Sequence, residues 1–351
     1  MKNQMRTAVL LLFILASRHS VRREGGMRIA VLLLFFLTAR AQAGVKNLER
    51  VTVSGSEYVR VAEWADNAGL TMKWNRKDQD IALSGPVEPL EFTVDSRKIQ
   101  IGGVTVWLSL PIVNRSGVAL VSLADLRTTL EPVLFPRKSD ARVQTICLDP
   151  GHGGKDSGKT DHHNYEKQYT LLLGRQVESL LKDDGFKVVL TRTTDETVEL
   201  PDRALIASRR GADLFVSMHY NAADTDVRGV EVYCLTPAGM NSSDVGGGRS
   251  PQLPDTGNAQ DERNVLLAYE VQRSITRSLP LEDRGMKRSR FEVLREARMP
   301  AILIEGGFMS QPEDARNIYD AAFRKRMARA IADGILAYKH AVERQGYDKS
   351  F

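Results

Sequence analysis

The second half of the chain alternates between short apolar runs and longer segments whose apolar residues recur at helical spacing. This alternation predicts strand 143–148, helix 166–183, strand 187–191, helix 203–210, strand 213–219, strand 229–235, helix 263–278, strand 300–305 and helix 312–343. Strands and helices that alternate in this way typically build a parallel sheet. The pattern therefore predicts an α/β fold, with a twisted and mainly parallel sheet that carries helices on both faces.

The preceding part of the chain follows another pattern. Apolar residues at helical spacing begin at Tyr58 and end before Gly69, and short strand-like runs separated by turn signals come next. This pattern predicts a small α+β domain. The predicted organisation is a small domain over 44–135, a linker over 136–142, a large domain over 143–343 and a tail over 344–351.

The first 43 residues predict a secretory signal. Arg28 precedes an uncharged, mostly apolar run over 29–39, and residues 41–43 form a small-x-small cleavage site. That run is too short for a membrane-spanning helix, which needs about 20 residues. The segment before it nearly repeats it, and we favour a true start at Met27 over a duplicated leader. We expect export to the periplasm or cell envelope without a stable membrane anchor after cleavage. Retention of both apolar runs as an anchor is the alternative.

The charge of the chain is concentrated in this leader. The whole chain has a formal net charge of +5, but residues 1–43 hold seven basic residues and one acidic residue, which leaves −1 for the remainder. A basic balance can indicate nucleic-acid binding, but here it belongs to the leader, and we predict no nucleic-acid partner. The two cysteines, Cys147 and Cys234, are too few for a disulfide-rich scaffold or a cysteine-ligated zinc ribbon. We expect two separately buried thiols.

Three predicted strands of the large domain end in residues that carry chemistry. His152 follows the first of these strands within a Gly-rich turn, His219 ends the strand over 213–219, and Glu305 ends the strand over 300–305. Ligands of open α/β sheets bind outside the carboxyl ends of the strands. Glu166 stands at the start of the helix after the first strand, at the same edge. We therefore expect these four side chains to lie together.

Two imidazoles and a carboxylate are the ligand set of catalytic zinc, whose fourth position is left for water. Zinc lowers the pKa of this water, and a nearby carboxylate can take its proton. The four candidates thus divide into three ligands and one base, and their spacing leaves open whether Glu166 or Glu305 is the ligand. His162 and His163 lie close to Glu166 in a polar loop. We expect them to be solvated rather than to compete as ligands. We also expect the basic segment from Arg284 to Phe291 to be a solvated loop.

The motifs of the large domain resemble the zinc-dependent N-acetylmuramoyl-L-alanine amidases of the type 3 family. They are LDPGHGG over 148–154, EK over 166–167, ADLFVSMHYN over 212–221, GVEVY over 229–233 and PAILIEGGF over 300–308. The resemblance implies one Zn²⁺ held by His152, Glu166 and His219, with Glu305 as the general base. It also implies cleavage of the amide between the lactyl group of N-acetylmuramic acid and L-alanine in peptidoglycan.

The small domain carries the run DSRKIQIGG over 95–103. With this run, the segment 58–134 resembles the copper amine oxidase N-terminal-like domain, which suggests a spacer or a wall-contact module. Some cell-division members of the amidase family carry an inserted blocking helix. The Gly- and Pro-rich stretch over 238–262 does not have the pattern of such a helix. The sequence does not identify an activator protein. Two other functions remain as alternatives. One is a catalytically silent cell-wall-binding protein, and the other is a zinc peptidase that acts on stem peptides.

Overall fold

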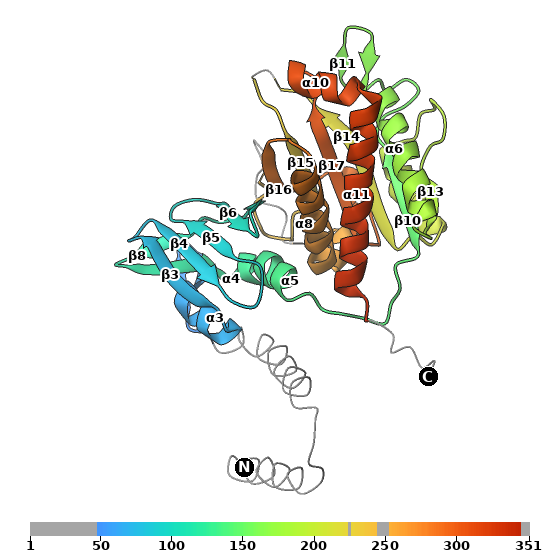
Figure 1. The fold of residues 1–351 in the computed structure, drawn as a ribbon. Coiled ribbons are helices and arrows are strands. Elements are labelled where there is room, and N and C mark those ends of the chain that lie inside the picture. Colours follow the sequence, from blue (N-terminus) through green and yellow to red (C-terminus); the bar gives the residue numbers. More distant parts are fainter. Residues whose placement is uncertain (1–47, 224–225, 244–252, 345–351) are drawn as a thin grey trace, which may run out of the picture.

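The computed structural model describes residues 48–223, 226–243 and 253–344, and Figure 1 draws the others as a grey trace. The predicted leader over 1–43 lies outside the described residues, as does the predicted tail from residue 345 onward. The loop predicted over 238–262 is described only in part. Within the described ranges, no helix is long and apolar enough to cross a membrane.

The N-terminal part is mostly β-structure. Its elements are β1 (Arg50–Val53), β2 (Ser56–Arg60), α3 (Val61–Ala68), β3 (Thr71–Arg76), β4 (Asp80–Ser84), β5 (Leu90–Thr93), β6 (Lys98–Ile101), β7 (Val104–Trp107), β8 (Val113–Arg115), β9 (Val118–Ser122), α4 (Leu123–Asp125), η2 (Leu126–Leu130) and α5 (Glu131–Leu134). The helix predicted from Tyr58 begins only at Val61, because Tyr58 and Val59 pair with β9 as strand residues. Four strands form one antiparallel sheet in the order β1-β2-β9-β8.

The larger part alternates strands and helices, as the sequence predicts. Its elements are β10 (Thr145–Pro150), β11 (Thr160–Asp161), β12 (Asn164–Tyr165), α6 (Glu166–Asp183), β13 (Lys187–Leu190), α7 (Leu200–Arg209), β14 (Leu214–Asn221), β15 (Val230–Leu235), η3 (Thr256–Gln260), α8 (Asp261–Ser278), β16 (Asp283–Ser289), α9 (Glu292–Arg295), β17 (Ala301–Phe308), α10 (Pro312–Tyr319) and α11 (Ala321–Val342). Residues 136–142 run as an extended connection from α5 to β10 (Figure 1).

The central sheet is parallel through its middle and carries helices on both faces, which confirms the predicted fold class. β13, β10, β14 and β17 are parallel neighbours, and β15 joins β17 in the antiparallel sense. Helices α6, α8 and α11 pack on one face, whereas α9 packs on the other and contacts α7. Apolar side chains from alternate strand positions fill both layers. The sheet is therefore buried on both sides, and its strand ends remain available for chemistry.

Two predictions for the larger part are wrong in detail. The helix predicted over 312–343 is two helices, because Asp320 is extended and its Oδ1 accepts a hydrogen bond from Phe323 N as the N-cap of α11. The basic segment from Arg284 to Phe291, which the sequence suggests is a solvated loop, forms strand β16 over most of its length. Arg288 in this strand is fully buried and donates to the carbonyl groups of Leu235 and Thr128.

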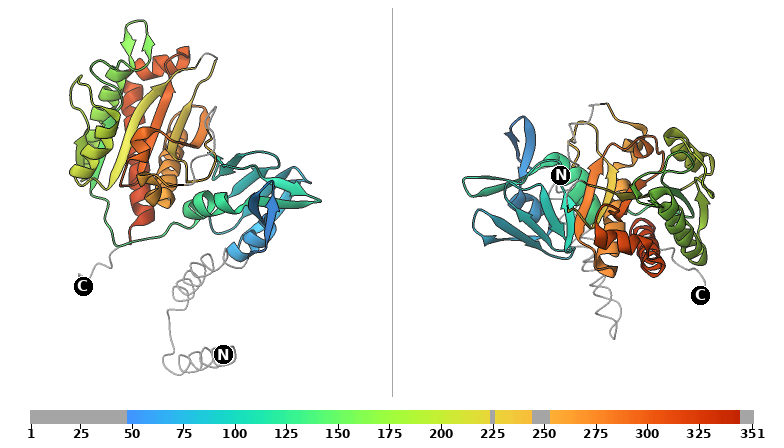
Figure 2. Two further views of the ribbon diagram at one scale, coloured as in Figure 1. Left: turned by 180° about the vertical axis from the view of Figure 1, so that it is seen from behind. Right: turned by 90° about the horizontal axis from the view of Figure 1, so that it is seen from above.

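Strand β16 also joins the two parts of the chain. The sheet runs on through β7, β6, β5, β4 and β3, so that eleven strands from both parts form one sheet. Met286 pairs with Val106, and the indole Nε1 of Trp107 donates to Arg284 O at 2.9 Å. Figure 2 shows the N-terminal part lying beside the larger part in both views. The N-terminal strands thus cover what is otherwise an edge strand.

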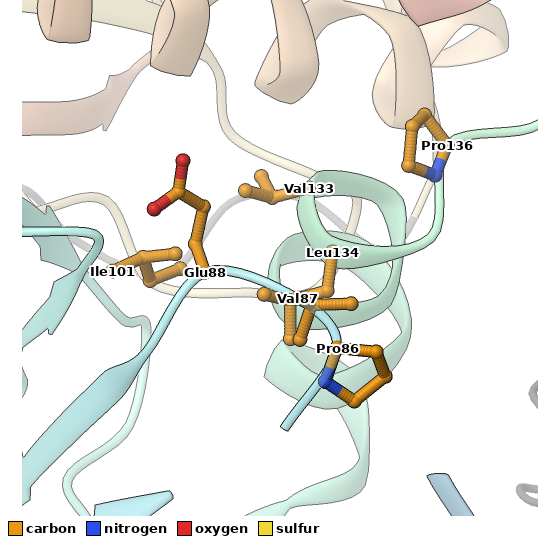
Figure 3. A pocket seen from close by; sticks show the side chains of 7 residues that line it. All are labelled: Pro86, Val87, Glu88, Ile101, Val133, Leu134 and Pro136. Atoms are coloured by element: carbon orange, nitrogen blue, oxygen red, sulfur yellow. The ribbon is translucent and has the colours of Figure 1, made fainter. Parts of the chain in front are cut away.

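A groove of about 490 Å³ opens at the same junction. Figure 3 shows its lining side chains, which come from the β4–β5 connection, β6, α5 and the residues after α5. They are Pro86, Val87, Glu88, Ile101, Val133, Leu134 and Pro136. Glu88 at its margin pairs with Arg273 of α8, with 3.0 Å between Oε1 and Nη1. The junction therefore combines sheet pairing with polar contacts and leaves part of its apolar surface open.

Candidate functional site

The four side chains that the sequence singles out come together at the carboxyl edge of the sheet. His152 follows β10, Glu166 is the first residue of α6, His219 lies near the end of β14, and Glu305 lies in β17. His219 and Glu305 are register partners on neighbouring strands. All four line one cavity of about 390 Å³. The expected convergence is therefore present in the structure.

Three of the four offer donor atoms that point at one position. His152 Nε2 lies 3.0 Å from Glu166 Oε1, His219 Nδ1 lies 3.0 Å from the same oxygen, and the two ring nitrogens lie 3.1 Å apart. A tetrahedral ion with bonds of about 2.0–2.1 Å separates its ligands by roughly 3.3 Å. These donor atoms therefore fit a small transition-metal ion with little movement. His152, Glu166 and His219 form the one such group found among the described residues.

The backbone around the first histidine is shaped for this convergence. His152 has a φ of 59°, a left-handed conformation that is uncommon for residues other than glycine and is often found at functional sites. A Cβ atom at Gly151 would lie 2.2 Å from Cε1 of His219, so only glycine lets the second imidazole approach so closely. The Gly-rich turn of the sequence thus serves to bring two imidazoles together.

Hydrogen bonds from the surrounding chain hold the Glu166 carboxylate. Oε1 accepts from Tyr220 N at 3.0 Å, and Oε2 accepts from Lys159 N at 2.9 Å. Burial opposes ionisation, but contacts with His152 and His219 outweigh it and hold the pKa of Glu166 well below its usual range. Glu166 is therefore ionised at neutral pH.

Asp156 is a functional candidate that the sequence reasoning missed. Its Oδ2 lies 2.7 Å from Nδ1 of His152, the ring nitrogen that faces away from the convergent donors. Burial lowers the pKa of His152, but Glu166 and Asp156 outweigh burial and raise it. A carboxylate on the outer nitrogen fixes the ring orientation of a ligand histidine. The sequence feature that could have identified Asp156 is its place four residues after His152 in the same loop.

Glu305 differs from Glu166 in its surroundings. Its Oε2 is buried and has no hydrogen-bond partner among the described residues. Burial, followed by the charges of Glu166 and Glu231, raises the pKa of Glu305 well above its ordinary value, and Lys159 partly offsets this rise. A carboxyl group that is unpartnered and faces the cavity is suited to exchanging a proton there. The two glutamates thus have environments that suit different tasks.

A buried ionic network supports the loop of His152 from behind. Arg203 Nη1 lies 2.8 Å from Asp149 Oδ1, and its Nη2 donates to His152 O at 3.0 Å. Asp149 also accepts from Thr191 Oγ1 at 2.6 Å and from Ser217 Oγ at 2.7 Å. Asp149 therefore holds the loop rather than an imidazole nitrogen, and both carboxylate oxygens already have partners.

Other side chains with possible chemistry lie outside the group of metal-binding atoms offered by His152, Glu166 and His219. His162 and His163 are exposed at the turn between β11 and β12 and do not join the group formed by His152, Glu166 and His219. Cys147 and Cys234 are buried free thiols, as the sequence predicts. The buried guanidinium of Arg192 donates to the carbonyl groups of Pro150 and Gly151, so it braces the turn and is not available to substrate.

An α/β sheet that gathers two histidines and two carboxyl groups at its carboxyl edge is the architecture of a hydrolase with a candidate metal site. Comparison with known proteins agrees, because a sequence model described as N-acetylmuramoyl-L-alanine amidase matches residues 146–337, more than half of the chain. The chain belongs to this family of peptidoglycan amidases. The family assignment thus rests on the part of the chain that carries all four site residues.

Individual relatives extend the similarity over most of their own lengths. The chain is 32% identical to the uncharacterized protein YqiI of Bacillus subtilis over 233 residues, which are 66% of this chain and 97% of YqiI. It is 30% identical to N-acetylmuramoyl-L-alanine amidase AmiA of Escherichia coli over 232 residues, 59% of this chain and 80% of AmiA. Among solved structures, amidase AmiC2 of Nostoc punctiforme is 36% identical, with 57% of this chain and 99% of AmiC2 covered and a TM-score of 0.47.

Proposed function

We propose that this amidase is a zinc enzyme that cleaves the amide between the lactyl group of N-acetylmuramic acid and L-alanine. His152, Glu166 and His219 would hold one Zn²⁺, and Glu305 would act as the general base. The observation that carries the proposal is the triangle of donor atoms with sides of 3.0–3.1 Å. Two nitrogen donors and one oxygen donor are the set that catalytic zinc sites use.

Each residue has a defined task in this mechanism. Bound zinc would supply Lewis-acid polarisation of the scissile carbonyl and a water of lowered pKa. Glu305 takes the proton from the attacking water and delivers it to the alanine nitrogen as the amide breaks. Burial and the neighbouring carboxylates raise its pKa, which makes Glu305 a stronger base than an ordinary carboxylate. Asp156 holds the His152 ring, and the Tyr220 and Lys159 amides hold Glu166.

The proposal includes export, because peptidoglycan lies outside the cytoplasm. The signal pattern over 27–43 supports it, together with relatives described as probable cell wall amidases. We infer work in the periplasm or cell envelope. The N-terminal part would then act as a wall-facing module that is fixed to the amidase part through the shared sheet.

The test is digestion of purified peptidoglycan with zinc-loaded enzyme, followed by mass analysis of the fragments. Release of peptides that begin with L-alanine is the expected result, and a chelator should abolish it. Glu305→Gln should keep zinc and lower kcat/KM by about 10²–10⁴-fold. Full activity of this variant with zinc bound would refute the mechanism. Cleavage inside the stem peptide would favour the zinc peptidase, and binding without any release would favour the silent wall-binding protein.

A further inference from the structure

Lys159 is the one lysine or arginine among the described residues that line the site. The lining residues are His152, Asp156, Gly158, Lys159, Glu166, His219, Tyr220, Asn221 and Glu305. The mechanism uses the backbone amide of Lys159 and leaves its ammonium group without a task. The question is what this positive charge at the cavity binds.

The backbone of Lys159 is fixed on both sides by one residue. Its amide donates to Glu166 Oε2 at 2.9 Å, and its carbonyl accepts from Glu166 N at 2.9 Å. The side chain therefore starts from a defined point, directly beside one of the convergent donors. Its charge is close enough to Glu305 to lower the pKa of that carboxyl group. The ammonium group thus belongs to the cavity by geometry as well as by charge.

The ammonium group has no ion-pair partner among the residues that the structure describes. Lys167, eight residues later, shows the contrast, since its Nζ lies 2.7 Å from Asp195 Oδ2 and 2.8 Å from Gly154 O. Lys159 is exposed, whereas Glu166 is buried. Lys159 therefore combines a place in the cavity lining with a solvent-exposed side chain, so its ammonium group is free to meet a substrate that enters from outside.

The charges around the cavity indicate what this group would attract. Asp156, Glu166 and Glu305 place three carboxyl groups in the lining, against the single ammonium group of Lys159. Bound zinc would offset two of these negative charges, and the ammonium group of Lys159 adds the further positive charge that an acidic peptide needs at this cavity. An ammonium group at hydrogen-bond distance of a carboxylate also gains a charge-assisted bond.

We propose that Lys159 binds a free carboxylate on the stem-peptide residue that follows L-alanine, and so makes the enzyme prefer acidic stem peptides over amidated ones. This inference rests on the proposed function of the same site. Binding at the mouth acts on substrate and transition state alike. The preference is therefore expected chiefly in KM, with kcat nearly unchanged.

The test uses two muramoyl peptides that differ only at this group, a free carboxylate in one and a primary amide in the other. Zinc-loaded wild-type enzyme should favour the acidic peptide by about three- to tenfold in kcat/KM at low salt, and by less at high salt. Lys159→Met should remove the preference, and Lys159→Arg should keep most of it. Lys155→Met, in the same loop but outside the cavity lining, is the matched control and should retain the preference.

The outcomes separate this inference from the function beneath it. If Lys159→Met keeps the wild-type ratio and the wild-type thermal stability, the proposed role of Lys159 is wrong while the amidase function stands. If the wild-type enzyme cleaves both peptides equally well, the proposed role of Lys159 is likewise wrong and the amidase function stands. If the zinc-loaded wild type cleaves neither peptide between the lactyl group and L-alanine, the proposed function itself fails.

Discussion

Replacing Arg203 by methionine tests how strongly the buried network supports the site. The side chains of Arg203 and Asp149 are 3% and 0% exposed, and the change leaves the Asp149 carboxylate buried without its cation. It also removes the donor that holds His152 O at 3.0 Å. We therefore expect one substitution to lower both the stability of the fold and the affinity for zinc.

The magnitude follows from the partners that remain. Removing one member of a buried ion pair typically costs about 3–5 kcal/mol. Asp149 keeps the hydroxyl donors of Thr191 and Ser217, at 2.6 and 2.7 Å, so the lower end applies. A loss of about 3 kcal/mol corresponds to roughly a hundredfold change in the folding equilibrium constant. Zinc affinity should fall by about tenfold or more, because the strained His152 backbone loses its support.

Urea unfolding of the metal-free protein measures the first effect, and a competitive zinc titration measures the second. Arg209→Met, on the exposed side of the same helix, is the matched control and should stay within about 0.5 kcal/mol of wild type. The double variant Arg203→Met/Asp149→Asn should lose less stability than the sum of its single changes, because the unpaired charge is gone. Arg203→Met with wild-type stability, or a strictly additive double variant, would contradict the reasoning.

Three further predictions concern the metal ligands and the junction. Asp156→Asn should lower zinc affinity by about ten- to hundredfold, because Asp156 Oδ2 lies 2.7 Å from Nδ1 of His152; a competitive titration measures this, and unchanged affinity contradicts it. Wild-type zinc affinity should fall as the pH is lowered, because protons compete with zinc for the imidazole of His152. The fall should begin at a higher pH than for an ordinary imidazole, because burial lowers the pKa of His152 but Glu166 and Asp156 raise it more. Zinc titrations at a series of pH values show where the fall begins. Arg288→Met should cost about 2–3 kcal/mol in urea unfolding, because the buried carbonyl group of Leu235 and the partly buried one of Thr128 lose their hydrogen-bond donor; wild-type stability would refute this.

The hydrophobic pattern by itself determined the α/β class and most elements of the larger part. Helix α6 begins and ends where its period predicts, because its apolar stripe and its burial coincide. The three polar residues at strand ends were equally visible, since an apolar strand has no packing reason to end in histidine or glutamate. Local signals of this kind survive folding, because each element must bury its own apolar face.

Other features were decided only by tertiary contacts. Strand β16 reads as a polar, basic loop, and it becomes a strand because β15 on one side and β7 on the other satisfy its backbone. Which glutamate meets the histidines was likewise open. The structure places Glu166 Oε1 at 3.0 Å from both ring nitrogens, and Glu305 Oε2 has no hydrogen-bond partner within the described part of the chain. Distances between residues far apart in the sequence depend on how the strands align, and no local pattern encodes that alignment.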